Sequence, residues 1–150
     1  MRRTPALLAC ACTAAALLLP AAPAVAADAE REAIDALNDV RRAHGLRALR
    51  VSRNLNRSSG RYARRMIRRD FFGHASRIQM AGGFRSAGET LAWHRGWHAQ
   101  PRRTVRRWMH SPGHRAVLLS PRFRWVGMGL AKGKLGSRVA TTWVAHVGSR

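Results

Sequence analysis

Cysteine is almost absent from this 150-residue chain. Cys10 and Cys12 are the only two, and both lie near the N-terminus. The rest of the chain therefore has no thiol for a disulfide, an iron–sulfur cluster or a cysteine nucleophile. A domain without such cross-links needs an ordinary apolar core, for which the sequence offers five tryptophans and four phenylalanines.

Long apolar runs are also lacking. The run over residues 6–19 is shorter than the roughly 20 residues that a membrane-spanning helix requires. Arg2 and Arg3 precede it and small residues follow at 24–27, which is the order of a secretory signal and its cleavage site. We predict a signal peptide over residues 1–27 and one mature domain over residues 28–150, located outside the cell or at the cell envelope.

Acidic residues are scarce: the chain has 7 Asp and Glu against 28 Lys and Arg. Removal of residues 1–27 takes away Arg2 and Arg3 and leaves a formal net charge of +19. Such a field attracts polyanions, and the forked guanidinium group suits phosphate and carboxylate. Lys132 and Lys134 are the only lysines. The alternative reading is a genome whose base composition favours arginine codons.

Two helices are predicted first. Residues 29–44 carry Ile34, Leu37 and Val40 at helical spacing, and Gly45 ends the helix. A second helix starts after Ser52 and runs to about residue 70. One stripe of this second helix consists of arginines alone. We predict a contact surface for anions on this stripe, with a plain solvated face as the alternative; its members are Arg61, Arg64, Arg65, Arg68 and Arg69.

The remaining segments complete an α+β pattern, in which helices cover a small antiparallel sheet. Residues 47–51 are expected to be a connection and residues 71–83 a loop. Further expectations are a strand over 87–94 and a helix from Pro101 that ends or restarts at residues 111–113. The last elements are expected to be strands over 125–131 and 139–147, joined by a turn at 132–137.

Short signatures in this order resemble the CAP superfamily, which groups cysteine-rich secretory proteins, antigen 5 and pathogenesis-related 1 proteins. The resemblance is closest to the short bacterial branch, whose domain is called SCP-like. It spans nearly the whole mature length. The matching segments lie at residues 37–46 (LNDVRRAHGL), 71–76 (FFGHAS), 88–92 (GETLA), 108–115 (WMHSPGHR) and 126–129 (VGMG).

The resemblance implies a three-layer α–β–α sandwich with a central cleft lined by two histidines and acidic residues. In some members this cleft holds a divalent metal such as zinc. The residues of this sequence that match the site are His74, Glu89 and His114. The sequence departs from the larger eukaryotic members in having Ser111 where they have a second glutamate, and Thr90 where they have an asparagine.

The chemistry of these three residues has two readings. Two imidazoles and a carboxylate could bind Zn²⁺ and leave a position for water, as in a metal-dependent peptidase or esterase, with Glu89, His74 and His114 as the candidate catalytic residues. Alternatively, they hydrogen-bond one another and tie loops to the sheet. Glu89 does not comfortably serve as both third ligand and general base, which favours a non-catalytic role.

We therefore expect a secreted, non-catalytic binding module, with a metal-dependent hydrolase as the alternative. Its expected partners are anionic cell-envelope polymers or lipid headgroups, and a small lipid or glycan in the cleft. A loop just after Glu89, with His94, His98, Trp93 and Trp97, could line the rim of that cleft; the alternative is that these tryptophans pack against their own domain. No specific nucleic-acid partner is expected, and the only cofactor considered is zinc or another divalent cation. The mature protein is expected to be monomeric.

Overall fold

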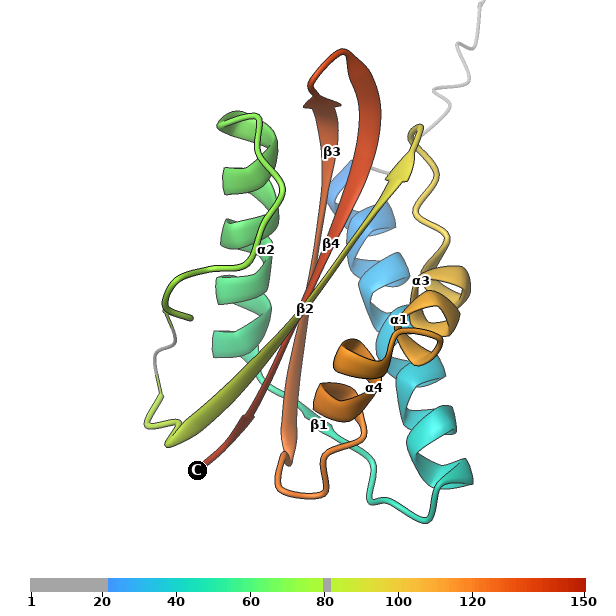
Figure 1. Ribbon diagram of the computed structural model, residues 1–150, viewed down its shortest axis with the longest axis vertical. Helices are drawn as coiled ribbons and strands as arrows, with labels where there is room; N and C mark the ends of the chain where they lie inside the picture. The colour runs from blue at the N-terminus through green and yellow to red at the C-terminus, as the bar shows by residue number, and fades with distance from the viewer. Residues whose placement is uncertain (1–21, 80–81) are drawn as a thin grey trace, which may run out of the picture.

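Helices lie on both faces of a central sheet (Figure 1). The computed structural model of the chain describes residues 22–79 and 82–150. Helix α2 (Arg53–Arg68) covers one face, while α1 (Ala22–Ala43), α3 (Pro101–Met109) and α4 (Pro112–Leu118) cover the other. This arrangement confirms the predicted three-layer α–β–α sandwich. None of the helices in the described part of the chain is long and apolar enough to span a membrane.

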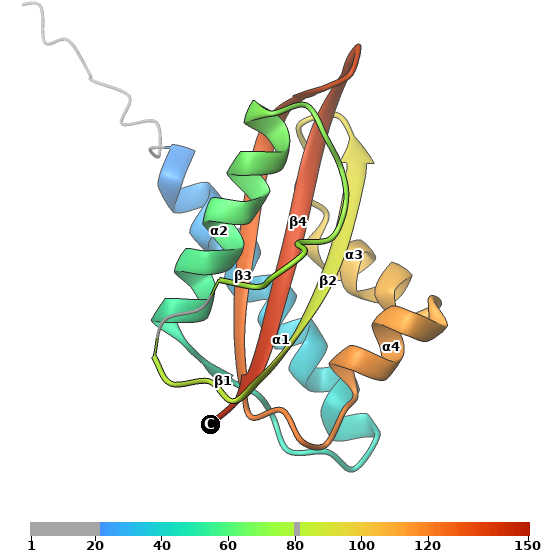
Figure 2. The same cartoon turned by 60° about the vertical axis from the view of Figure 1, so that its left-hand side comes forward.

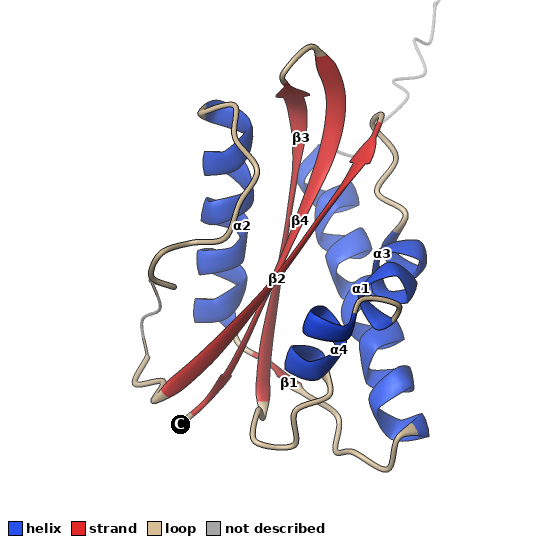
Figure 3. Cartoon of the chain, viewed as in Figure 1, coloured by secondary structure: helices blue, strands red, loops and turns tan. Residues whose placement is uncertain are grey.

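The sheet has four strands in the order β1-β3-β4-β2. Strands β2 (Ser86–Arg95), β3 (Trp125–Leu135) and β4 (Arg138–Ser149) pair antiparallel, so that β4 lies in the centre and β2 at one edge. At the other edge, β1 (Arg50–Val51) pairs parallel with the start of β3. In Figure 3 the strands of the sheet lie between α2 on one side and α1, α3 and α4 on the other.

The predicted elements are present, with three corrections. The connection expected at residues 47–51 contains strand β1, because Arg50 and Val51 pair with Trp125 and Val126. The turn expected at 132–137 is tighter, since β3 runs to Leu135 and Gly136 takes the left-handed turn position with φ 59°. Helix α1 starts at Ala22, not at residue 29.

The predicted signal peptide falls mostly outside the described residues, which begin at residue 22. Residues 22–27 form the first turns of α1, so the predicted cleavage point lies within this helix. The signal peptide stays a prediction.

Two apolar clusters follow from the period-2 alternation of the strands. On the side of α1, α3 and α4, the cluster includes Met128, Leu130 and Trp143 together with Trp108. On the side of α2, a smaller cluster includes Met66, Leu91 and Val144. The α2 side has less apolar bulk, and polar side chains take up part of that layer.

Glycines on β3 let α2 lie directly on the sheet. A Cβ at Gly127 would overlap the backbone of Leu55, and one at Gly129 would overlap the backbone of Ser59 and Gly60. The Ser59 hydroxyl donates a hydrogen bond to the Gly127 carbonyl, with 3.0 Å between the oxygens. The close approach fixes the height of α2 above the sheet, and therefore the position of every side chain that α2 points at it.

Arg41 attaches α4 to α1. It is fully buried, and its guanidinium donates hydrogen bonds to the carbonyls of Leu118 and Ser120 at the end of α4. A third bond of 3.0 Å runs from its Nε to the Arg47 carbonyl. Burial and the nearby Arg124 lower the pKa of this side chain. The bonds fix the short helix that carries His114.

Candidate functional site

A chain of polar contacts crosses the layer between α2 and the sheet. It joins Ser58 on α2, His146 on β4, Glu89 on β2 and His74 in the loop that follows α2. Figure 2 shows this loop passing from the end of α2 along the sheet toward β2, the edge strand. Segments far apart in the sequence therefore meet at a single carboxylate.

Glu89 is the centre of this network and is almost fully buried. Its Oε1 accepts hydrogen bonds from His74 Nδ1 at 2.9 Å and from the backbone N–H of Ala75 at 3.0 Å. Its Oε2 accepts one from His146 Nε2 at 2.9 Å. Burial raises the pKa of Glu89, but the hydrogen bonds from His146, Ala75 and His74 together outweigh it, and the pKa lies below its usual value. Glu89 is thus an ionised, fully hydrogen-bonded carboxylate at neutral pH.

His146 occupies the interior end of the network. It is 2% exposed, its Nε2 bonds Glu89, and its Nδ1 lies 2.7 Å from the Ser58 hydroxyl. The oxygen of that hydroxyl is also 3.0 Å from the Leu55 carbonyl oxygen within α2. The contacts on both ring nitrogens fix the imidazole relative to both the helix and the sheet.

The three residues expected at the site lie together. His74 bonds Glu89 directly, and the rings of His74 and His114 face each other with 6.4 Å between centroids. His74 is mostly exposed, and His114 is half-buried on α4. Burial and the nearby His74 lower the pKa of His114. The histidines thus lie at the rim of the site, with the carboxylate beneath them.

A metal ion does not fit these donors as they are arranged. Both oxygens of Glu89 are engaged by N–H donors, and His74 turns Nδ1 toward that carboxylate. Across residues 22–79 and 82–150, no group of three or more His, Asp or Glu side chains is placed to hold a metal. A zinc role for His74, Glu89 and His114 stays a prediction from the resemblance, and the function proposed below does not use one.

Sequence reasoning missed His146, although Glu89 bonds it. The residue lies in a run of apolar residues that was correctly predicted as a strand, where a single histidine has no partner nearby in the sequence. The sequence did contain one chemical signal. His146 is the one ionisable side chain of the run WVAHV, and its ring nitrogens need hydrogen-bond partners if the strand is buried. Its partner could not be found without the strand register, which places Glu89 opposite His146.

Two hollows lie on either side of the loop that carries His74. The first, lined in part by Ser58, Tyr62 and His146, lies against α2. The second has a volume of about 290 Å³ and lies against α3 and α4, where Phe72, Trp93 and His114 contribute to its walls. Trp93 lines this groove, but it lies with His94 on strand β2 and not in a loop. His94 is buried, and the exposed Trp97 and His98 do not line the groove. The Glu89 network separates an arginine-rich hollow from an aromatic one.

The predicted arginine stripe is present and exposed along α2. All five members, Arg61, Arg64, Arg65, Arg68 and Arg69, are exposed to solvent. Within the described residues, the ion pairs are Asp39–Arg42, Glu32–Arg102 and the two histidine contacts of Glu89, so none of the five pairs with a carboxylate there. We call these five residues the arginine face.

Known proteins match both the sequence and the fold. Residues 34–147 match the family described as CAP, the cysteine-rich secretory protein family. YkwD, an uncharacterized protein of Bacillus subtilis, is 29% identical over 117 residues, which cover 72% of this chain and 44% of YkwD. The chain thus spans less than half the length of that relative.

Among solved structures, an extracellular protein of Bacillus anthracis that contains an SCP domain superposes with a TM-score of 0.71. It is 20% identical, over 91% of this chain and 45% of that one. An outer surface protein of Borrelia burgdorferi superposes with a TM-score of 0.66 at 18% identity, over 82% of this chain and 93% of that one. These two share the fold, and the family match covers most of the chain: the protein belongs to the CAP superfamily.

Proposed function

We propose that this protein is an exported, non-catalytic binding domain that attaches to anionic lipid headgroups or polymers of the cell envelope through its arginine face. The observation that carries the proposal is the run of five exposed arginines on α2, none paired with a carboxylate of the described residues. Like charges three and four residues apart on a helix repel one another, so a bound anion would relieve that repulsion.

The distribution of the few acids supports the same orientation. Five of the seven lie at residues 28–39, within α1, while residues 40–150 hold 25 basic residues against Asp70 and Glu89 alone. Helix α1 and α2 lie on opposite faces of the sheet (Figure 1). An anionic surface would therefore attract the α2 side of the molecule and repel the acidic stretch of α1 at residues 28–39.

The state of Glu89 supports binding over catalysis. A general base needs a free lone pair directed at its substrate, and the Glu89 carboxylate already accepts three hydrogen bonds. Its contacts hold the loop after α2 against the sheet, and His146 in turn contacts Ser58 on α2. The extracellular and outer surface descriptions of the Bacillus anthracis and Borrelia burgdorferi proteins agree with an envelope location.

The test is co-sedimentation of the purified protein with vesicles. We compare vesicles of phosphatidylcholine alone with vesicles that also contain phosphatidylglycerol, and use a soluble polyphosphate to represent anionic polymers. Binding to each partner is measured between 50 and 500 mM NaCl. We expect binding only to the anionic partners, with affinity that falls as salt rises. Binding that ignores ionic strength would contradict the proposal.

Paired variants locate the surface. Arg64→Gln/Arg69→Gln removes two charges from the arginine face, and Arg103→Gln/Arg106→Gln removes two exposed charges from α3 on the other side of the sheet. At about 1 kcal/mol per basic residue near an anionic membrane, the first pair should weaken vesicle binding roughly 30-fold, and the second should have little effect. Equal losses would mean that overall charge, not α2, determines attachment.

A further inference from the structure

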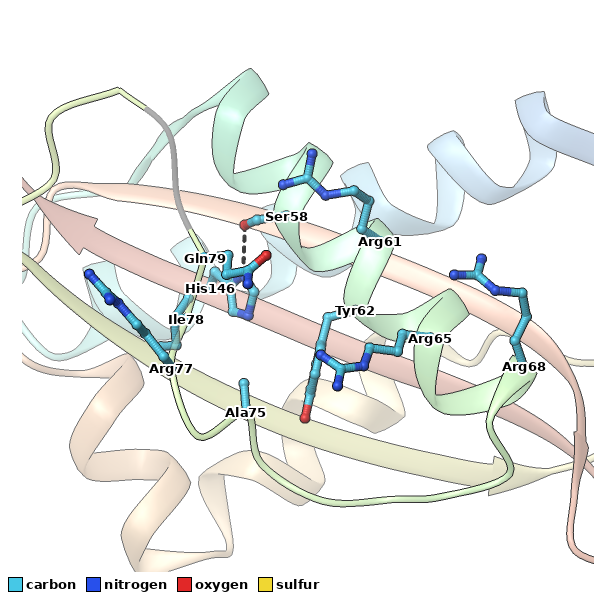
Figure 4. Close-up of a pocket in the computed structure, with 10 residues that line it drawn as sticks. All are labelled: Ser58, Arg61, Tyr62, Arg65, Arg68, Ala75, Arg77, Ile78, Gln79 and His146. Carbon is cyan, nitrogen blue, oxygen red and sulfur yellow. Dashed lines mark hydrogen bonds between the residues drawn. The ribbon is translucent and has the colours of Figure 1, made fainter.

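The arginine-rich hollow lies between α2 and the loop segment at residues 74–79. Its volume is about 240 Å³. Arg61, Arg65 and Arg68 line it from α2, and Arg77 lines it from the loop. Figure 4 shows the α2 arginines on one side and Arg77 on the other, with Ser58 and His146 between them. Arginine residues from two separate segments thus line one cavity.

The charge of this cavity is not balanced by the described protein. None of its ten lining residues is acidic. Among the residues that the structure describes, none of the four arginines has a carboxylate within ion-pair distance. Four positive charges around one space favour a ligand with more than one negative charge, and the guanidinium fork matches phosphate oxygens with two parallel N–H bonds.

The inner end of the cavity is polar and held in place. Ser58 and His146 both line it, and both are almost fully buried. The contact of His146 with Glu89 and that of Ser58 with His146 fix these side chains before any ligand arrives. Glu89 bonds His74, Ala75 and His146 and forms no ion pair with the cavity arginines. A preformed polar end reduces the ordering cost of binding.

The remaining wall is apolar. Tyr62, Ala75 and the half-buried Ile78 contribute to it. Two contacts hold the Tyr62 side chain in place. Its hydroxyl donates a 2.7 Å hydrogen bond to the Gly73 carbonyl, and its ring and that of Phe71 meet edge to face. The volume is below the roughly 300–1,000 Å³ of pockets that bury drug-sized ligands, so the cavity suits a small group.

We propose that this cavity is a binding site for a small organophosphate, with the phosphoryl dianion among the arginines and a short apolar substituent against Tyr62 and Ile78. The site goes beyond surface attachment because it takes one ligand at one place. It shares Arg61, Arg65 and Arg68 with the arginine face, whereas Arg77 belongs to the cavity alone.

Isothermal titration calorimetry with phenyl phosphate at pH 7.5 and 300 mM NaCl tests the proposal. The probe is a dianion at this pH, and the salt screens diffuse attraction to the surface. We expect one phenyl phosphate per protein, at least tenfold weaker binding of inorganic phosphate, and no binding of phenol. Absence of one-to-one binding by phenyl phosphate would overturn the proposal.

Two double variants locate the ligand. Arg65→Gln/Arg77→Gln should weaken phenyl phosphate binding at least tenfold, whereas Arg64→Gln/Arg69→Gln, outside the cavity, should change it less than twofold. Thermal unfolding midpoints within about 2 °C of the unmodified protein would show that both variants keep the fold. Equal weakening by both pairs would overturn the assignment. Loss of vesicle binding alone would count against surface attachment and leave the cavity site standing.

The phosphoryl group could be free or carried by a lipid, and competition separates the two sources. Soluble dihexanoyl phosphatidic acid is added to the complex with phenyl phosphate. Displacement at equimolar concentration indicates that the cavity accepts a lipid headgroup, and no displacement indicates a free organophosphate. Both results support a phosphoryl site, and they differ only in what delivers the group.

Discussion

Glu89 holds together segments that are separated by most of the chain. Its carboxylate receives His74 and Ala75 from the loop after α2 and His146 from β4. Residues 40–150 contain just one other acid, Asp70, and the side chain of Asp70 bonds the backbone N–H of Gly136 at the β3–β4 turn. Both acids of this stretch therefore serve a structural contact.

The pKa of Glu89 predicts a pH dependence of stability. A carboxyl whose pKa is lower in the folded than in the unfolded protein stabilises the fold above its unfolded pKa of about 4.3, and that stabilisation is lost as the pH falls through the folded value. We expect Glu89→Gln to lower the free energy of unfolding at pH 7 by about 1–3 kcal/mol. The measurement is urea unfolding between pH 7 and pH 3.

The difference between the two proteins should shrink toward pH 3, because the native carboxyl is then losing its charge as well. Asp39→Asn is the matched control, since Asp39 is exposed and pairs only with Arg42 on its own helix; it should change stability by less than about 0.5 kcal/mol. A Glu89→Gln effect that stays constant with pH would contradict the role given to the ionised carboxylate.

For single residues, the sequence predicted three members of the site and missed two others. His74, Glu89 and His114 were found because short motifs surround them. His146 and Arg77 lie in segments without a motif, one in an apolar strand and one in a loop. Their roles depend on strand register and on how the loop lies over the sheet, and both are set by contacts between residues far apart in the sequence.

Among the elements, α2 contributes to both proposals, and its position depends on glycine. The face of the helix opposite the arginine face is buried and includes Leu55, Tyr62, Ala63 and Met66. The sequence pattern did not show why β3 carries the VGMG segment. Gly127 and Gly129 face α2 and leave room for its backbone. The two-residue strand β1 was missed because so short a segment has no periodicity to detect.

Gly129→Ala tests this contact. The added methyl group would meet the α2 backbone at Ser59 and Gly60, which cannot turn aside as a side chain can. We expect a loss of about 3 kcal/mol in the free energy of unfolding, measured by urea denaturation. Phenyl phosphate binding should weaken as well, because α2 carries most of the cavity arginines.

Gly113→Ala is the control for Gly129→Ala. Gly113 lies in α4 with open space around its Cα and no positive φ. Alanine there should leave stability unchanged or raise it by about 0.5 kcal/mol. If both alanine variants behaved alike, the contact between α2 and β3 would not be the close one described here.

Over the whole molecule, positive charge outweighs negative charge far more than folding requires. A net charge this far from zero destabilises the compact state by self-repulsion. We expect the thermal unfolding midpoint to rise as NaCl is raised from 20 to 300 mM, by roughly 4 °C if screening contributes about 1 kcal/mol. Differential scanning fluorimetry measures this shift.

The quadruple variant Arg64→Gln/Arg69→Gln/Arg103→Gln/Arg106→Gln should show a smaller rise, since it carries four fewer charges. A midpoint that falls with salt, or an equal rise in both proteins, would indicate that repulsion among the arginines is not what salt relieves. The charge excess was read correctly from composition. Only the fold shows that α1, which carries five of the seven acids, and the arginine face lie in opposite layers.

Strand β1 is only two residues long, which leaves most of the outer edge of β3 without a neighbouring strand. Side chains accept hydrogen bonds from the strand backbone there. The Met128 N–H donates to Asn56 Oδ1 at 3.0 Å, and the Leu130 N–H donates to Glu30 Oε1 at 2.9 Å. Open strand edges invite copies of a protein to pair and aggregate. Molecules crowded together on a polyanion would thus meet with part of this edge already hydrogen-bonded, which lowers its tendency to pair with a strand of another copy.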